Sequence, residues 1–353
     1  MYAFYITGIV DFQTILTPLL TSLKKGKKCW VCFFDSLFLK RQFYFYKPQE
    51  LISFIEELCV ENDVEIPIIN FYGQKDEQIF LEHYDQKQPD VVFLKNGYHK
   101  HPIWYPTAHA SKVIHFAHGS DSVTNLHLSP YKINLNVLQK EYIIPIEKQL
   151  EMYNHKHPNV DHQYFGDFCI EQFNFKKLLK TIKAINTDKK ICFIPESWLP
   201  STTESEWNKI GEFADKVVGW LQNNGYYVVY KTREKGYPKY NDELGIKHNV
   251  KWASTLDFMK NKPDFIIKKD LNFPSSLVYY PLIADICVSI CNTGGMTSAK
   301  SINKNVIEFN SNIDFELQLS NKIEYFRSKK QKKNIKVDAI SELLLDYIDK
   351  NVG

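Results

Sequence analysis

Short runs of consecutive apolar residues alternate with longer segments of helical spacing through the first 125 residues of the chain. The apolar runs predict strands, and they read YAFYITG (2–8), KCWVCFFD (28–35), EIPIINF (65–71), PDVVFLKNG (89–97) and KVIHFAHG (112–119). Between them, apolar side chains recur every three or four residues, which predicts helices over 11–26, 48–63 and 75–86. Strands that are apolar throughout and alternate with helices indicate a parallel sheet covered on both faces.

A second alternating set follows a stretch of short apolar pieces interrupted by Pro145, Pro158 and Gly166. Its predicted strands lie at 190–197, 226–236, 249–254, 264–270, 285–291 and 305–309, and its predicted helices at 205–225, 275–284, 294–303 and 337–352. The two sets predict an α/β protein of two Rossmann-like domains whose parallel sheets face each other across a cleft. Sheets of this kind bind ligands at the carboxyl ends of their strands.

The domain organisation follows from these sets. We expect an N-terminal Rossmann-like domain over 1–170, a linker over 171–190, a C-terminal Rossmann-like domain over 191–320, and a basic loop with a last helix over 321–353. A length of 353 residues suits two domains. A cleft between two domains suits an enzyme with two substrates, because closure brings the reactants together and expels water.

Composition narrows the class of protein. Apolar residues make up 44% and charged residues 24% of the chain, which is ordinary for a globular protein. The net charge of +3 is too small to indicate a nucleic-acid partner. No apolar run has the length of a membrane-spanning helix, and Asp11 is the only charged residue among the first 23, which is not the layout of a signal peptide. We therefore expect a cytoplasmic protein.

One segment is strongly basic although the net charge of the chain is small. Residues 327–333, RSKKQKK, carry five positive charges in seven positions. A solvated loop before the last helix accounts for them. The alternative is peripheral contact with a membrane surface or an anionic acceptor.

The seven cysteines are expected to be free thiols. CWVC at 29–32 has the spacing of a redox pair, but it lies within an apolar strand, where residues three apart point to opposite faces. We expect no redox site there.

A polar turn with paired glycines provides the first candidate site. It follows the predicted strand at 285–291 and opens a helix, and its candidate ligand-binding residues are Thr293, Gly294, Gly295, Met296, Thr297 and Ser298. Glycines let backbone N–H groups approach a ligand, and the helix end favours an anion such as a nucleotide diphosphate. An ordinary turn with a hydroxyl helix cap is the alternative. The spacing matches neither a Walker A loop nor GxGxxG.

Two further strand ends of the second domain carry candidate donor-binding residues. Lys231 and Arg233 follow the apolar strand YYVVY, where a cation would neutralise a diphosphate. Glu196 and Ser197 follow the domain's first strand. Solvated charges and helix capping are the alternative explanations.

In the first domain, VIHFAHGSDS places His118 just after a strand. A neutral imidazole there would accept a proton from an acceptor hydroxyl, or orient the acceptor, and Asp121 would orient the imidazole or bind a sugar hydroxyl. The candidate acceptor-binding residues are Gly8, Asp11, Gly119 and Ser120. Asp11 as a helix cap is the alternative.

A metal site is the other use for histidine in this region. Six of the 11 histidines fall between 99 and 127, but their spacing matches no structural zinc site and no HExxH is present. We therefore expect no metal and no cofactor beyond a nucleotide-sugar co-substrate.

Four segments carry a resemblance to the GT-B glycosyltransferases, and within them to the CDP-glycerol glycerophosphotransferase-like and capsular-polysaccharide transferase group. FAHGSDS resembles the group's His-Gly motif, and YFGDFCIEQF its segment leading to the linker. VVYKTREKGYP resembles its basic strand end, and LIADICVSICNTGGMTSAKSINKNVIEFN the segment that holds the nucleotide diphosphate. The resemblance implies two Rossmann-like domains and metal-independent catalysis.

The sequence departs from the group at several of these positions. Ser120 and Asp121 replace the Thr-Pro that normally follows His-Gly, and Tyr237 stands where a His is expected before Pro238. Cys291-Asn292-Thr293-Gly294-Gly295 replaces the group's Asp-Tyr-Ser-Ser turn, and the helix that follows lacks a Glu often seen at the ribose. These departures favour sugar transfer over glycerophosphate transfer.

The predicted function is therefore a glycosyltransferase. It would move a sugar from a nucleotide-activated donor to a hydroxyl acceptor, such as a glycan, in surface-glycan or polysaccharide synthesis. A sugar-nucleotide 2-epimerase, a glycerophosphotransferase and a non-catalytic nucleotide-sugar or glycan-binding relative are the alternatives.

Overall fold

The chain forms two compact units in a computed structural model. The first comprises residues 1–176 and 337–353, and the second residues 177–336. The structure describes residues 1–6, 9–34, 48–73, 75–95, 112–116, 141–143, 161–163, 185, 187–195, 204–231, 255–267, 280–290, 299, 305–309, 314–328 and 340–351. The segment expected to form a C-terminal region of its own, 321–353, is thus divided between the two units.

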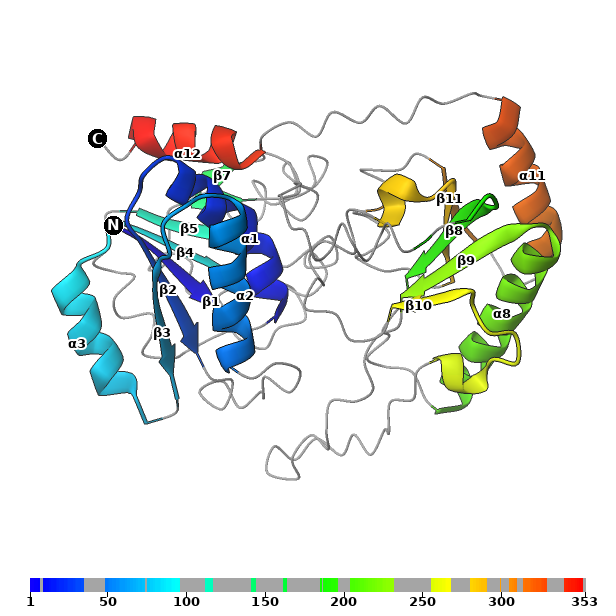
Figure 1. Cartoon of the computed structure of the whole chain (residues 1–353), viewed down its shortest axis with the longest axis horizontal. Coiled ribbons are helices and arrows are strands. Elements are labelled where there is room, and N and C mark those ends of the chain that lie inside the picture. The colour runs from blue at the N-terminus through cyan, green and yellow to red at the C-terminus, as the bar shows by residue number, and fades with distance from the viewer. Residues whose placement is uncertain are drawn as a thin grey trace. The chain divides into compact units, whose positions relative to one another are not determined.

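A parallel sheet forms the centre of the first unit (Figure 1). Its strands are β1 (Tyr2–Ile6), β2 (Cys29–Phe34), β3 (Ile68–Tyr72), β4 (Val91–Lys95), β5 (Lys112–Phe116), β6 (Glu141–Ile143) and β7 (Asp161–Gln163). The order across the sheet is β3-β2-β1-β4-β5-β6-β7, and every pairing is parallel. The predicted parallel sheet is confirmed, and β6 and β7 extend it beyond the strands that the sequence predicts.

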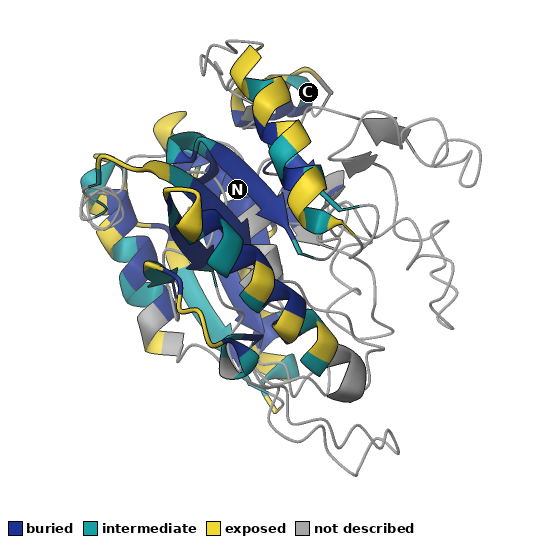
Figure 2. Cartoon of the chain, turned by 90° about the vertical axis from the view of Figure 1, so that its right-hand side faces the viewer, coloured by how far each residue is buried: buried dark blue, intermediate teal, exposed yellow. Residues whose placement is uncertain are grey.

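Helices cover both faces of this sheet. They are α1 (Ile9–Lys24), α2 (Pro48–Glu61) and α3 (Glu77–Lys87). The α3 helix lies on one face, where Phe80 and Tyr84 join Trp30 and Tyr5 in a buried aromatic cluster. In Figure 1, α1 and α2 lie on the other side of the strands. Figure 2 shows that helices of the chain have buried positions along one side and exposed positions along another.

The CWVC segment lies inside β2, and both of its cysteines are buried. Burial raises the pKa of the Cys29 thiol to about 12 and holds the pKa of Cys32 well above its usual value. The thiolate is the reactive form of cysteine, and burial of both side chains disfavours it. The prediction that CWVC lies within an apolar strand is confirmed.

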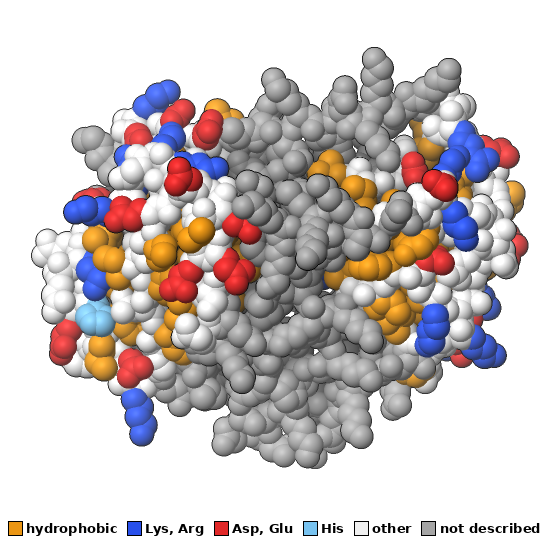
Figure 3. Space-filling model, in the orientation of Figure 1, with side chains coloured by type: hydrophobic (Ala, Val, Ile, Leu, Met, Phe, Trp, Pro, Cys, Tyr) orange, Lys and Arg blue, Asp and Glu red, His pale blue; other side chains and the backbone are white. Residues whose placement is uncertain are grey.

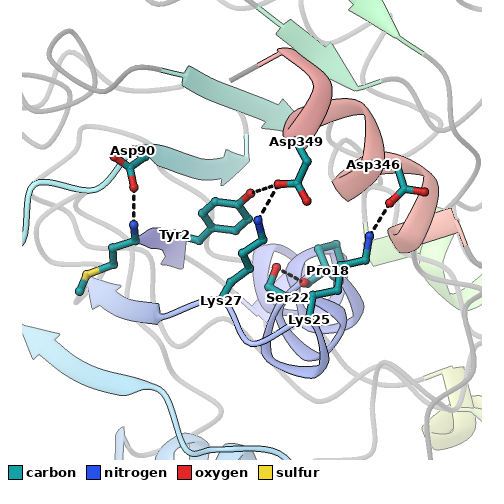
Figure 4. A network of polar contacts seen from close by, with 9 residues as sticks. Tyr2, Pro18, Ser22, Lys25, Lys27, Asp90, Asp346 and Asp349 are labelled. Carbon is teal, nitrogen blue, oxygen red and sulfur yellow. Dashed lines mark hydrogen bonds and ion pairs between the residues drawn. The ribbon is translucent and has the colours of Figure 1, made fainter. Parts of the chain in front are cut away.

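The last helix, α12 (Ile340–Asn351), returns to the first unit and packs beside α1. Polar contacts hold it there (Figure 4): the Tyr2 hydroxyl donates to Asp349 Oδ1 at 2.9 Å, and Lys27 Nζ lies 2.7 Å from the same oxygen. Lys25 Nζ lies 2.5 Å from Asp346 Oδ1. Burial alone would raise the pKa of Asp349, but the hydrogen bonds from Lys27 and Tyr2 outweigh it and lower that pKa. The carboxylate is therefore the form that the contacts favour.

The second unit is built on a smaller parallel sheet. Its strands are β8 (Lys190–Pro195), β9 (Tyr226–Lys231), β10 (Phe265–Ile267), β11 (Ile286–Ser289) and β12 (Val306–Glu308). They lie in the order β10-β9-β8-β11-β12, again with parallel pairing throughout. Two Rossmann-like parallel sheets are therefore present, as the sequence predicts.

One face of this sheet packs against α8 (Glu204–Asn223), the 3₁₀ turn η7 (Thr255–Phe258) and α11 (Phe315–Ser328). Asp215 on α8 accepts hydrogen bonds from the backbone N–H groups of Lys260 and Asn261 at 2.7 and 2.6 Å, which fixes the segment after η7 to the helix. The sequence did not predict α11, whose last two residues are the first two of the basic run 327–333.

Asp285 holds the amino ends of the central strands together. Its Oδ2 accepts the N–H of Ile191 at 2.8 Å, its own N–H donates to the Ile191 carbonyl at 2.8 Å, and Asn305 Nδ2 donates to its carbonyl at 3.0 Å. These bonds tie β8, β11 and β12 at the edge opposite their carboxyl ends. None of these three bonds lies at the carboxyl edge, where the segments that follow the strands begin.

Candidate functional site

The sheet order of the second unit locates its ligand edge. The chain runs outward from β8 through β9 to β10, then returns to place β11 on the other side of β8. In open parallel sheets, ligands bind outside the carboxyl ends of the two strands at such a reversal. The strands here are β8 and β11, and the residues that follow them are Glu196 and Ser197 in one case and 293–298 in the other. Two candidate segments that lie about 100 residues apart in the sequence thus leave adjacent strands.

Two described residues bracket the glycine turn. Ile290 follows the last residue of β11, and Ala299 is helical and fully buried. Ala299 packs in a cluster with Phe193 of β8 and Cys287 of β11. The segment 291–298 therefore begins after the carboxyl end of β11, and the chain packs against the same two strands again at Ala299. The turn and helix that the sequence predicts there stay a prediction, and they would give the strand-turn-helix context that binds anions.

Lys231 is the candidate donor-binding side chain that the structure describes most fully. It is half-buried and ends β9, and it pairs in register with Pro195, the last residue of β8, and with Ile267, the last of β10. The preceding residue, Tyr230, is buried, and its hydroxyl lies 2.5 Å from Thr255 Oγ1. That hydrogen bond fixes the end of β9 to η7, so it positions Lys231 at the carboxyl edge.

The sheet order also reveals two cations that the sequence interpretation passed over. Lys268 and Lys269 directly follow β10, whose neighbour is β9. The signal was present in DFIIKKD, an apolar run followed by two lysines, just as the apolar run YYVVY is followed by one. Without the order of the strands, nothing in the sequence associates the two strand ends.

Charge differs sharply between the units. Residues 177–336 hold 26 Lys and Arg against 17 Asp and Glu, whereas 1–176 and 337–353 hold 18 against 24. The formal charges are therefore +9 and −6, which together give the +3 of the chain. Figure 3 shows positively and negatively charged side chains on the described surface of each unit. The units therefore differ in the numbers of the two kinds of charge, and each has both. A basic unit attracts anions, because its summed charge raises the local concentration of ions of the opposite sign.

The first unit has its own strand reversal, between β1 and β4. Gly8 comes two residues after β1, and His118 comes two residues after β5, which lies on the other side of β4. The sequence predicted that the first helix begins at Asp11, whereas α1 begins at Ile9, so Asp11 is the third residue of the helix and not its cap. Its assignment as an acceptor-binding residue stays a prediction. The backbone of Lys95 ends β4, between these two segments.

Most of the predicted site lies outside the described residues, and its side-chain geometry stays a prediction. The residues concerned are Gly8, His118, Gly119, Ser120, Asp121, Glu196, Ser197, Arg233, Thr293, Gly294, Gly295, Met296, Thr297 and Ser298, together with 329–333 of the basic run. What the structure adds is the strand that each segment follows.

The described part of the chain offers neither a metal site nor a membrane-spanning helix. Its His, Cys, Asp and Glu side chains form no group of three or more suited to hold a metal ion. None of its helices is both long enough and apolar enough to cross a membrane.

Comparison with known proteins gives a likeness in structure only. No protein-family model and no curated protein matches the chain. The chain is similar to a putative UDP-N-acetylglucosamine 2-epimerase from Listeria monocytogenes (11% identity, TM-score 0.61, 99% of this chain and 96% of that chain). It is also similar to MnaA of S. aureus solved with UDP (12%, 0.56, 99% and 96%) and to a glycosyltransferase from Rickettsia africae ESF-5 (12%, 0.52, 99% and 98%).

At 11–12% identity, these matches establish the fold. The chain has the two-sheet GT-B fold of epimerases and glycosyltransferases, which confirms the predicted fold class. The finer resemblance to the CDP-glycerol group stays a prediction.

Proposed function

We propose that the chain is an enzyme that binds a nucleoside diphosphate sugar on its second unit and breaks the bond between the sugar and the diphosphate. The observation that carries this proposal is the order β10-β9-β8-β11-β12. The carboxyl end of β11, after which the predicted glycine turn follows, is next to that of β8, after which Glu196 follows, and Lys231 ends β9 one strand further on. Backbone N–H groups, a helix end and a cation are the groups that bind a diphosphate. The +9 charge of this unit supports the assignment.

Within this class we propose a glycosyltransferase with a hydroxyl acceptor on the first unit. His118 would act there as general base or would orient the acceptor. Its segment leaves β5, two strands from β1 and one from β4, on the carboxyl edge of the first sheet. The resemblance of FAHGSDS to a transferase motif, and the fold shared with the Rickettsia glycosyltransferase, support this choice.

A UDP-sugar 2-epimerase is the second candidate. The observation that favours it is that similar structures include the Listeria protein and a further UDP-GlcNAc 2-epimerase from Methanocaldococcus jannaschii, with TM-scores of 0.61 and 0.57. Both reactions begin by breaking the bond between the sugar and the diphosphate. They then differ, because a transferase passes the sugar to an acceptor whereas an epimerase requires no acceptor.

An assay with donor alone separates the two reactions. The protein is first screened by calorimetry against UDP, CDP, GDP and CMP, and the sugar nucleotides of the base that binds are then incubated with it without acceptor. We expect no epimer at C2 and at most slow hydrolysis. Rapid conversion to the 2-epimer would overturn the transferase assignment and establish the epimerase, whereas binding of none of the nucleotides would contradict both.

Lys231 provides the sharpest test of the donor site. We expect Lys231→Met to weaken binding of the nucleoside diphosphate by roughly tenfold or more, the loss of one hydrogen bond to a charged group. The matched control is Lys216→Met, which removes an exposed lysine from the middle of α8. Calorimetry on both variants measures the effect. Equal affinity in Lys231→Met and the wild type would show that the diphosphate does not bind at the end of β9.

A further inference from the structure

We propose that Gly211 on α8 and Thr255 on η7 are positioning residues for the donor site, because together they set the place of the strand end that carries Lys231. This inference rests on the proposed function and deepens it. It names residues that determine the affinity for the nucleotide through Lys231 and not by contact with the nucleotide. Neither residue belongs to the segments that directly follow the strands, in which the sequence analysis looked for candidates.

The first link is a hydrogen bond between the hydroxyl groups of Tyr230 and Thr255. The two oxygens lie 2.5 Å apart, and each residue is only 1% exposed. Tyr230 directly precedes Lys231 in β9, and Thr255 is the first residue of η7. A hydrogen bond that is shielded from water is stronger than an exposed one. The position of η7 therefore determines where β9 ends.

Lys231 ends β9 on the same face of the sheet as Ala299. Residues two apart in a strand lie on one face, and Val229, two residues before Lys231, packs in one cluster with Ala299. Ala299 directly follows the segment 291–298, in which the sequence predicts the glycine turn. The place of the Lys231 side chain relative to that segment therefore depends on how the end of β9 is held.

The second link is the close approach of η7 to α8 at Gly211. A Cβ atom at position 211 would lie 2.7 Å from Cβ of Phe258, closer than two such atoms can pack. Phe258 is the last residue of η7, and its Cβ is bonded to the backbone, so it could not withdraw without moving the turn. The lack of a side chain at Gly211 therefore allows η7 to lie where Thr255 reaches Tyr230.

Asp215 attaches the chain that follows η7 to the same helix. Its Oδ1 accepts the N–H groups of Lys260 and Asn261 at 2.7 and 2.6 Å. This end of the turn is therefore anchored. A displacement at Phe258 would tilt η7 about the anchor and move its other end, at Thr255, away from β9.

Calorimetry on the full-length protein tests the first link, with the tightest binder among UDP, CDP and GDP. We expect Thr255→Val to weaken binding by roughly three- to tenfold, the range of one hydrogen bond between neutral groups. Tyr230→Phe removes the other hydroxyl and should have the same effect. Thr255→Ser keeps a hydroxyl and should bind within about twofold of the wild type. Equal affinity in Thr255→Val and the wild type would overturn the proposal.

Two glycines of α8 test the second link. We expect Gly211→Ala to weaken binding by roughly three- to tenfold, as Thr255→Val does. The matched control is Gly219→Ala, whose new Cβ would meet Asn261 Nδ2 at 2.7 Å, the far end of an exposed side chain that can turn away. Both substitutions bring the same gain in helix propensity. Affinities that are equal in these two variants would contradict the role of Gly211.

The Lys231→Met background separates positioning from a merely structural effect. Thr255→Val and Gly211→Ala should cause no further loss of affinity there, because the residue through which they act is gone. Equal losses in both backgrounds would overturn the proposal. If Lys231→Met binds the nucleotide as the wild type does, the donor site is contradicted and this inference with it. A loss in Lys231→Met with none in Thr255→Val contradicts this inference alone.

Discussion

Replacement of His118 by alanine is expected to lower kcat by about 10²–10⁴-fold, the range for loss of a positioned general base. The nucleoside diphosphate should bind the variant as tightly as the wild type, because the proposed donor site lies on the second unit and His118 on the first. Initial rates and calorimetric affinities on the same preparation measure the two effects. The expectation requires the transferase reaction, in which the acceptor hydroxyl loses its proton as the bond to the sugar forms.

Two further measurements make this test specific. His83→Gln is the matched control, because His83 lies on α3 with Nδ1 2.9 Å from the Tyr72 hydroxyl, and β3 is separated from β5 by three strands. Its rate should equal that of the wild type. In wild-type protein, activity should fall on acidification, since an imidazolium cannot accept a proton, and the residual activity of His118→Ala should lack that dependence. Loss of nucleotide binding in His118→Ala would contradict the assignment of roles to the two units.

The strands of the fold were largely predictable because their signal is local. Runs such as CWVCFF are apolar at every position, and β2 is buried at every position as the central strands of a two-sided sheet must be. The helix α11 was missed because its apolar pattern is blurred. Leu319 and Ile323 are buried in the core, but Leu317 and Tyr325 are exposed, so the sequence shows no clean stripe.

The short strands β6 and β7 were missed for another reason. Glu141–Ile143 and Asp161–Gln163 have three residues each and include charged or polar side chains. Neither has the apolar run that predicts a buried strand. They are strands because β5 provides an edge onto which β6 pairs, and β7 pairs onto β6 in turn. Pairing of this kind depends on a partner far away in the sequence, which local pattern does not encode.

The candidate site, too, could be predicted only in part from the sequence. Sequence alone identified the segments after β5, β8, β9 and β11, because polar and glycine residues follow apolar runs there. It could not reveal which of these strands are neighbours, since that is set by the order of the sheet. Lys268 shows the difference: in the sequence it is one lysine after an apolar run, and it is associated with Lys231 only when β10 is known to pair with β9.

Leu345→Ala is expected to destabilise the first unit by about 2–5 kcal/mol, the cost of deleting a fully buried leucine side chain. Leu345 is 0% exposed on α12, whereas its neighbour Leu343 is 52% exposed on the same helix. Leu343→Ala makes the same chemical change with the same helix propensity and should alter the stability by no more than about 0.5 kcal/mol. The comparison therefore isolates packing against the unit from any effect on the helix itself.

Hydrogen exchange measures which of the two units Leu345→Ala destabilises. In Leu345→Ala, exchange should accelerate in α12 and in β1, because Tyr2 of β1 donates a hydrogen bond to Asp349 of α12. Exchange in β8, which belongs to the second unit, should stay as in the wild type. Equal destabilisation by Leu343→Ala and Leu345→Ala would contradict the docking of α12 through its buried stripe. Acceleration in β8 as large as that in β1 would show instead that α12 stabilises both units. The end of the chain, which returns to the first unit at residue 337, would then stabilise the second unit as well.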